Sequence, residues 1–153
     1  VVPRAFISTF LVAPVAWVFL YLMGRTTDAV RERVVLINDG KKDEIEKLWD
    51  EGAEDTEDDV VGLATSFVFA QSVRLLVGGT LPNAQGEEPL SVMREHTLTD
   101  ASKLVAIGCG LAMVEVLRVM YIKAQFKRLT PQLKNIIAMN FSWCVYFGLD
   151  WMC

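Results

Sequence analysis

The sequence predicts an all-α integral membrane protein, with four transmembrane helices in a bundle and an acidic amphipathic helical hairpin between the first and the second. Three observations lead to this prediction. Hydrophobic residues make up 52% of the 153 positions, which is above the usual share in a soluble domain. Long apolar segments alternate with polar ones. Thirteen of the nineteen acidic residues lie between Asp28 and Asp59. A single membrane domain over residues 1–153 is the simplest division of the chain.

The first two spans are predicted at about residues 5–23 and 60–80. The first has no charged residue in nineteen positions, and a helix of that length roughly matches a hydrocarbon core of about 30 Å. The second carries Gln71 and Arg74, and Gly78-Gly79 is expected to close it. Acidic residues are favourable at a helix N-terminus, so Thr56 or Asp58 is expected to cap the second span.

The other two spans are predicted at about residues 101–122 and 132–153. Thr99-Asp100 is expected to cap the third span, and Thr130-Pro131 to open the fourth. The third span is apolar but contains Glu115 and Arg118. Because intramembrane charges are costly and need partners, we expect this helix to be the central one.

The polar loop at residues 24–59 is expected to contain two helices outside the membrane. Apolar residues continue the helical period of the first span as far as Ile37, and a turn is expected at Asn38-Asp39-Gly40. A second short helix would then place Ile45, Leu48 and Trp49 on one face. The predicted partner-docking residues of this loop are Trp49, Glu54, Asp55 and Asp58. The acidic run lacks the spacing and glycine of an EF-hand, so a solvated face is favoured over a calcium site.

The depth of the polar residues predicts their partners. Arg74 and Asp150 lie near the same end of two spans that run in the same direction, which predicts an ion pair between them. Glu115 and Arg118 are three residues apart on one helix and can neutralise each other. Asn140 and Ser66 are expected at the depth of Glu115.

Two interpretations of these residues are open. In the first, they are structural contacts that fix how the helices pack, and the chain is a non-enzymatic subunit of a larger membrane complex, such as an organellar energy-converting assembly. In the second, the chain is a fragment of an ion channel or transporter, with Glu115 in the conduction or proton path. The intramembrane polar candidates for such a path are Glu115, Arg118, Asn140, Ser66 and Gln71. Few polar residues lie mid-membrane, which favours the first interpretation.

Several other classes are disfavoured. Membrane hydrolases and metalloenzymes need Ser/His pairs or ligand clusters, whereas the single histidine, His96, lies in a connector and is expected to be an interfacial polar side chain. No metal site or enzyme is therefore predicted, and the three cysteines are expected to be reduced. A pigment is a weaker alternative, with Glu115, Gln71 or Asn140 as magnesium ligands; lipid is the expected bound species. The acidic balance argues against nucleic-acid binding.

The basic residues predict the orientation. The segments at 24–59 and 123–130 contain nine Lys and Arg, against three on the opposite side, which places both on the cytoplasm, matrix or stroma side. The chain begins with valine, which suggests a processed chain or a fragment. An organellar membrane is therefore expected, with the plasma membrane as the alternative. The expected partners are lipids and other membrane subunits or copies of the chain itself.

Overall fold

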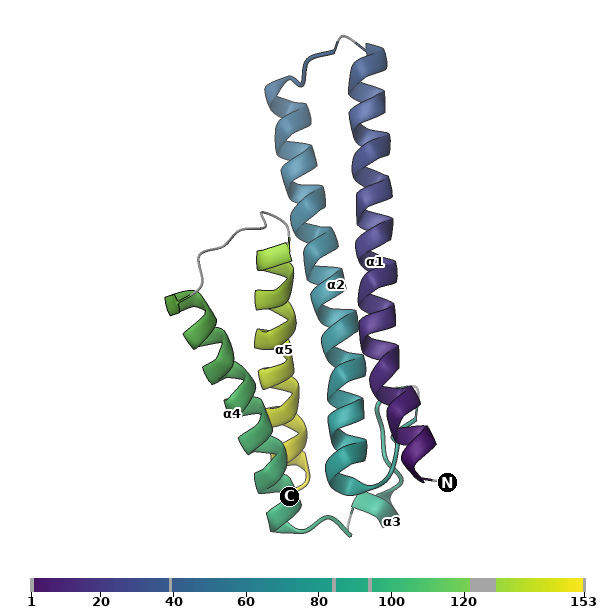
Figure 1. The fold of residues 1–153 in the computed structure, drawn as a ribbon, viewed down its shortest axis with the longest axis vertical. Helices are drawn as coiled ribbons and strands as arrows, with labels where there is room; N and C mark the ends of the chain where they lie inside the picture. Colours follow the sequence, from purple (N-terminus) through teal and green to yellow (C-terminus); the bar gives the residue numbers. More distant parts are fainter. Residues whose placement is uncertain (1, 39, 84, 94, 122–128, 153) are drawn as a thin grey trace.

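The computed structural model describes residues 2–38, 40–83, 85–93, 95–121 and 129–152. This part of the chain is built from four long helices and one short helical turn, and it contains no strand. The helices are α1 (Val2–Asn38), α2 (Glu44–Gly78), α3 (Leu90–Met93), α4 (Leu98–Tyr121) and α5 (Leu129–Asp150). Both ends of the chain lie at the same end of the molecule, which we call the terminal end (Figure 1). The connector at 81–97 lies there too, as predicted for a chain whose helices alternate in direction.

The first two helices form a hairpin that extends well beyond the others (Figure 1). The predicted loop at 24–59 is helical in the structure except around its turn, because α1 continues to Asn38 and α2 begins at Glu44. Asp43 caps α2 in a capping box with Glu46, in which each side chain bonds to the other residue's backbone N–H. The expected caps at Thr56 and Asp58 were therefore wrong, since both residues lie inside α2. We call residues 24–59 the arm.

Helix α2, rather than α4, is central. It contacts α1, α4 and α5, whereas α1 contacts α2 alone among the described helices. Half of the most apolar stretch of α2 is buried, against 6% for α1 and 17% for α4. The helices therefore form a layer in the order α1, α2, α5, α4, with α4 also reaching α2, rather than a bundle closed around one axis (Figure 1). The expectation that the charged third span is central was wrong. Its Glu115 and Arg118 bind each other, so these charges do not require partners on surrounding helices.

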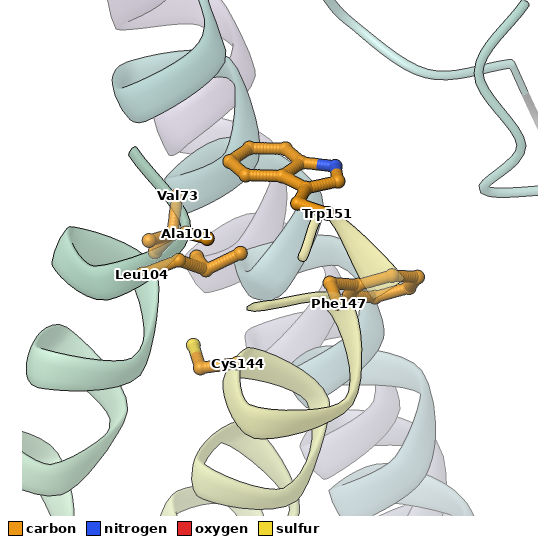
Figure 2. Packing of buried hydrophobic residues seen from close by; sticks show 6 residues of the cluster. All are labelled: Val73, Ala101, Leu104, Cys144, Phe147 and Trp151. Carbon is orange, nitrogen blue, oxygen red and sulfur yellow. The ribbon is translucent and has the colours of Figure 1, made fainter. Parts of the chain in front are cut away.

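The apolar core lies near the terminal end, where α2, α4 and α5 meet. Figure 2 shows Cys144 and Phe147 from α5 and Trp151 directly after it, together with Val73 from α2 and two residues of α4. The α4 residues, Ala101 and Leu104, are completely buried. Thr97 begins α4 by exchanging hydrogen bonds with Asp100, so the helix starts slightly earlier than predicted.

Within the described residues, three helices are long and apolar enough to cross a membrane, namely α1, α2 and α4. The predicted fourth span forms helix α5, which has a suitable length of 22 residues but does not reach the same apolarity. The reason lies in its polar residues, several of which face α2. Gln132 and Asn140 are 2% and 3% exposed, and Asn135 contacts Asp59 of α2. Helix α5 is thus polar on its buried side.

Hydrogen bonds cross the interface between α2 and α5 at several levels. Gln132 Nε2 donates to Asp58 Oδ1 at 2.6 Å, and Asn135 Nδ2 donates to Asp59 Oδ1 at 3.1 Å. Further along, Trp143 Nε1 donates to Ser66 Oγ at 3.3 Å. These pairs hold α5 beside α2 in one register. The first of them also shows that α5 begins beside Asp58, at the base of the arm.

Candidate functional site

A buried ionic cluster occupies the terminal end of the molecule. Arg74 of α2 lies with Nη2 3.0 Å from Glu88 Oε1, and both side chains are only 2% exposed. The other oxygen of Glu88 lies 2.8 Å from His96 Nε2, and the His96 side chain is 4% exposed. Glu88 therefore bridges a guanidinium and an imidazole. A buried cation is tolerated only when it is paired and hydrogen-bonded, and here the connector between α2 and α4 folds back to supply the partner.

The guanidinium of Arg74 is held by three further contacts. Its Nη1 donates to Gly86 O at 2.6 Å and to Gln71 Oε1 at 3.0 Å, while its carbon lies 3.9 Å from the centre of the Phe147 ring. Gly86 has a φ of +83°, which a glycine adopts without strain. A Cβ at this position would lie 2.8 Å from Phe67. The glycine therefore lets the connector approach α2 closely enough for its carbonyl to reach Arg74.

His96 is clamped between Glu88 and the end of α5. Its ring stacks on Trp151, with 3.8 Å between centroids and 17° between planes. Gly78, the last residue of α2, makes room for it, since a Cβ there would lie 2.6 Å from His96 Cε1. His96 is thus a buried contact between the connector, α2 and the residue that follows α5.

A cavity of about 550 Å³ opens beside this cluster. Its walls come from α2, the connector and α5: Phe67, Arg74, Gln85, Gly86, Glu87, Glu88, Trp143, Tyr146, Phe147 and Asp150. The volume falls in the range typical of small-molecule sites. The wall contains four aromatic rings and three carboxylates, and Arg74 is the single cationic side chain among these residues.

The structure gives Arg74 a different ion-pair partner from the expected one. Glu88 lies within ion-pair distance, whereas Asp150 forms part of the cavity wall and, among the described residues, makes no ion pair. The roles of Glu88 and His96 were not predicted, because the connector lacks a helical period that would show which side chains turn inward. Gly86 and Pro89, which flank Glu88, are typical turn residues, and turns usually lie at the surface.

Glu115 and Arg118 bind each other as expected from their spacing. Arg118 Nε and Nη2 donate to the two oxygens of Glu115, each at 2.6 Å. The side chain of Glu115 is 12% exposed and that of Arg118 is 19% exposed. Ser66 lies in the interface between α2 and α5, where it accepts from Trp143, and the buried Asn140 donates to Ile136 O within α5. No hydrogen bond links either of them to Glu115 among the described residues. Gln71 belongs to the Arg74 cluster instead.

The predicted docking residues of the arm occupy two different environments. Trp49 is 66% exposed, and Asp55 is also exposed. Asp58 is 6% exposed and binds Gln132, so it serves packing inside the chain. Glu54 is half-buried on α2.

Within the described ranges, no group of three or more His, Cys, Asp or Glu side chains is placed to hold a metal ion. Of the cysteines, Cys144 is buried and Cys109 exposed, both as free thiols, while Cys153 lies outside the described residues. No family model, no curated protein and no solved structure matches this chain. The geometry itself is therefore the basis for any functional assignment.

Proposed function

We propose that this chain is a non-enzymatic membrane subunit that binds a partner protein through the tip of its arm and so joins a larger membrane complex. The observation that carries this proposal is a group of large apolar side chains exposed around the turn between α1 and α2. Their exposed fractions are Leu36 72%, Ile37 84%, Ile45 76%, Leu48 69% and Trp49 66%. Large apolar side chains exposed close to one another along the chain favour an interaction surface. We call these five residues the arm tip.

Lipid does not explain the exposure of the arm tip. Helix α1 has 37 residues, which corresponds to about 55 Å at 1.5 Å per residue, whereas a hydrocarbon core is about 30 Å thick. The uncharged part of α1 ends at Met23, and α5 begins beside Asp58. Both helices of the arm would then leave the membrane at the same level and extend roughly 20 Å into water.

The charge of the arm selects the partner. Thirteen acidic residues lie between Asp28 and Asp59, against five Lys and Arg. Part of this charge is balanced within the arm, because Arg31 pairs with Asp28, Asp50 and Glu57. The excess is still acidic, which favours a basic protein surface with an apolar centre. Two arms of the same chain would repel each other, so a second copy is the less suitable occupant.

Helix α5 is proposed as the fourth span on the basis of its neighbours. It lies between α2 and α4 and contacts both, and Gln132 and Asn135 bond to acidic residues of α2. Buried polar residues that bond across helices are common in membrane proteins. Lipid would cover the outer faces of α1 and α4, where Phe19 and Val119 are among the exposed apolar residues.

Ion conduction through Glu115 is the weaker candidate. Both carboxylate oxygens accept from Arg118, so a passing cation or proton would first have to break this pair. The polar side chains of the neighbouring helices are bonded to each other along the interface between α2 and α5. Neither arrangement favours an open path.

The test compares two arm variants purified from the native membrane in mild detergent. Leu48→Ser with Trp49→Ser removes two of the five apolar side chains of the tip, and Lys47→Ser is the matched control on the same exposed turn. A photo-crosslinking residue at position 49 identifies the neighbour. We expect a basic protein that crosslinks and is retained by wild type and Lys47→Ser but lost from the double variant. Equal retention by both variants, or no crosslinked protein, would overturn the proposal.

A further inference from the structure

We propose that the cavity at the terminal end binds an organic ammonium group, either the headgroup of a choline or ethanolamine lipid or a free quaternary amine. This site is separate from the arm and does not depend on the partner proposed for it. The cavity has about 550 Å³, which exceeds the space that a trimethylammonium group needs. Three features of its walls point to this chemistry.

The first feature is an unbroken aromatic wall. Phe67 and Trp143 meet edge to face at 5.4 Å, Trp143 and Tyr146 at 6.4 Å, and Tyr146 and Phe147 at 5.1 Å. All four rings line the cavity. Aromatic faces attract cations through the ring quadrupole, and cages of several rings are the usual way in which proteins bind quaternary ammonium groups. Arg74 already uses the same attraction on Phe147.

The second feature is the balance of charge in the wall. Arg74, Glu87, Glu88 and Asp150 are the charged side chains that line the cavity. Arg74 and Glu88 neutralise each other at 3.0 Å, which leaves Glu87 and Asp150 as excess negative charge. Asn83 Nδ2 lies at 3.4 Å from Glu87 Oε2, and an amide of this kind does not cancel its charge. The cavity therefore favours a cation over an anion.

The third feature is the position of the cavity in the fold. Arg74 lies four residues before the end of α2, and Asp150 is the last residue of α5. This places the cavity at the level where a bilayer changes from hydrocarbon to headgroups, if the membrane spans α2 from Asp58 onward. Tyr146 is 59% exposed beside it, which suits an aromatic residue at that boundary. A metal ion fits less well, since the described residues hold no ligand cluster.

The binding test uses the full chain in a detergent without an ammonium headgroup. Tetramethylammonium chloride is titrated and the fluorescence of the tryptophans is followed, because Trp143 lies in the wall; sodium chloride at the same ionic strength is the blank. We expect saturable binding of tetramethylammonium only. Asp150→Asn should weaken it about tenfold or more through loss of the charge, and Tyr146→Leu about threefold. Asp55→Asn, the same charge change on the exposed arm, should leave it unchanged.

The two sources of the ammonium group are separated by a second measurement. Chain purified from its membrane is analysed by native mass spectrometry, with wild type compared with Asp150→Asn. Retention of a choline or ethanolamine lipid by wild type alone assigns the headgroup; saturable tetramethylammonium binding without a retained lipid assigns a free amine. The proposal is overturned if tetramethylammonium and sodium give the same response, or if Asp150→Asn binds as wild type does while circular dichroism shows it to be folded.

Discussion

Helix α5 packs against its two neighbours by different physical means. Its contact with α2 is polar, with side-chain hydrogen bonds at Asp58, Asp59 and Ser66. Its contact with α4 depends on small residues: a Cβ added to Gly108 would lie 2.7 Å from Cys144 Cβ, and one added to Gly148 would lie 2.5 Å from Val105. In a membrane, where apolar surface gains little from leaving lipid, these are the two main ways to hold helices together.

The two kinds of contact define two different properties of α5, namely its register along α2 and its distance from α4. Hydrogen bonds between specific atoms define the register along the helix, because a shift of one turn would separate each donor from its acceptor. Close contact of small residues instead defines the distance between two axes and is sensitive to volume alone. The α4–α5 interface should therefore respond mainly to added carbon atoms. The α2–α5 interface should respond to the loss of polar atoms as well, since its close glycine contact, between Gly62 and Asn135, is less tight at 3.0 Å.

The largest effect is expected at the terminal end, where Arg74 of α2 pairs with Glu88 of the connector beside the α2–α5 interface. Glu88→Gln keeps the shape of the side chain but leaves a buried guanidinium without its counter-charge. Breaking a buried pair by removing one partner costs about 3–5 kcal/mol, which thermal unfolding in detergent would detect. The double variant Arg74→Met with Glu88→Leu removes both charges and should recover part of this loss, since it also leaves His96 and the Gly86 carbonyl without their partners. Equal stability of Glu88→Gln and wild type would contradict the account.

The next largest effect is expected between α4 and α5. Gly108→Ala introduces a methyl group into the contact with Cys144, and overpacking of this kind costs about 1–3 kcal/mol. Gly110→Ala is the matched control two residues along the same helix, where an added Cβ meets nothing within 4 Å. Alanine is the better helix former by up to about 1 kcal/mol, so this control should be neutral or stabilising. If both variants lose the same stability in the same unfolding assay, close packing at Gly108 is not the cause.

The sequence predicted the helices well because their signals are local. The uncharged run of α1, the period that continues beyond it and the i, i+3 spacing of Glu115 and Arg118 can each be found within one segment. The predicted fourth span is a helix in the structure, although its apolarity falls short of the other three. A prediction from local hydropathy cannot tell that Gln132 turns toward α2, since its acceptor Asp58 is 74 residues away.

The candidate site could not be predicted for the same reason. The residues Arg74, Glu88, His96 and Trp151 come from α2, the connector and the end of α5. The prediction paired Arg74 with Asp150 because it compared the membrane depths of residues on helices only. A connector that folds inward can place a side chain such as Glu88 at the same depth. Gly78 and Gly86, which make room for that connector, resembled ordinary helix-ending and turn glycines.

An effect of similar size is expected at the base of the arm, where the α2–α5 interface begins. Asp58→Ala removes the acceptor of Gln132, and a hydrogen bond to a charged group contributes about 1.5–3 kcal/mol. Asp55→Ala changes the same charge one helical turn away on an exposed position, where substitutions stay within about 0.5 kcal/mol. Urea unfolding of the two variants under identical detergent conditions measures the difference. A loss of equal size in both would assign the effect to the net charge of the arm instead.

The smallest effect, and the sharpest test of the comparison, concerns the hydrogen bond from Trp143 to Ser66. Trp143→Phe removes this bond of 3.3 Å but also changes packing against Phe67 and Phe147. A double-mutant cycle with Ser66→Ala separates the two contributions, since lost packing is common to both backgrounds. Hydrogen bonds between membrane helices average about 0.6 kcal/mol, and a coupling of that size is expected from unfolding in detergent. A coupling of zero would mean that α2 and α5 are held here by ring packing, as α4 and α5 are held by volume.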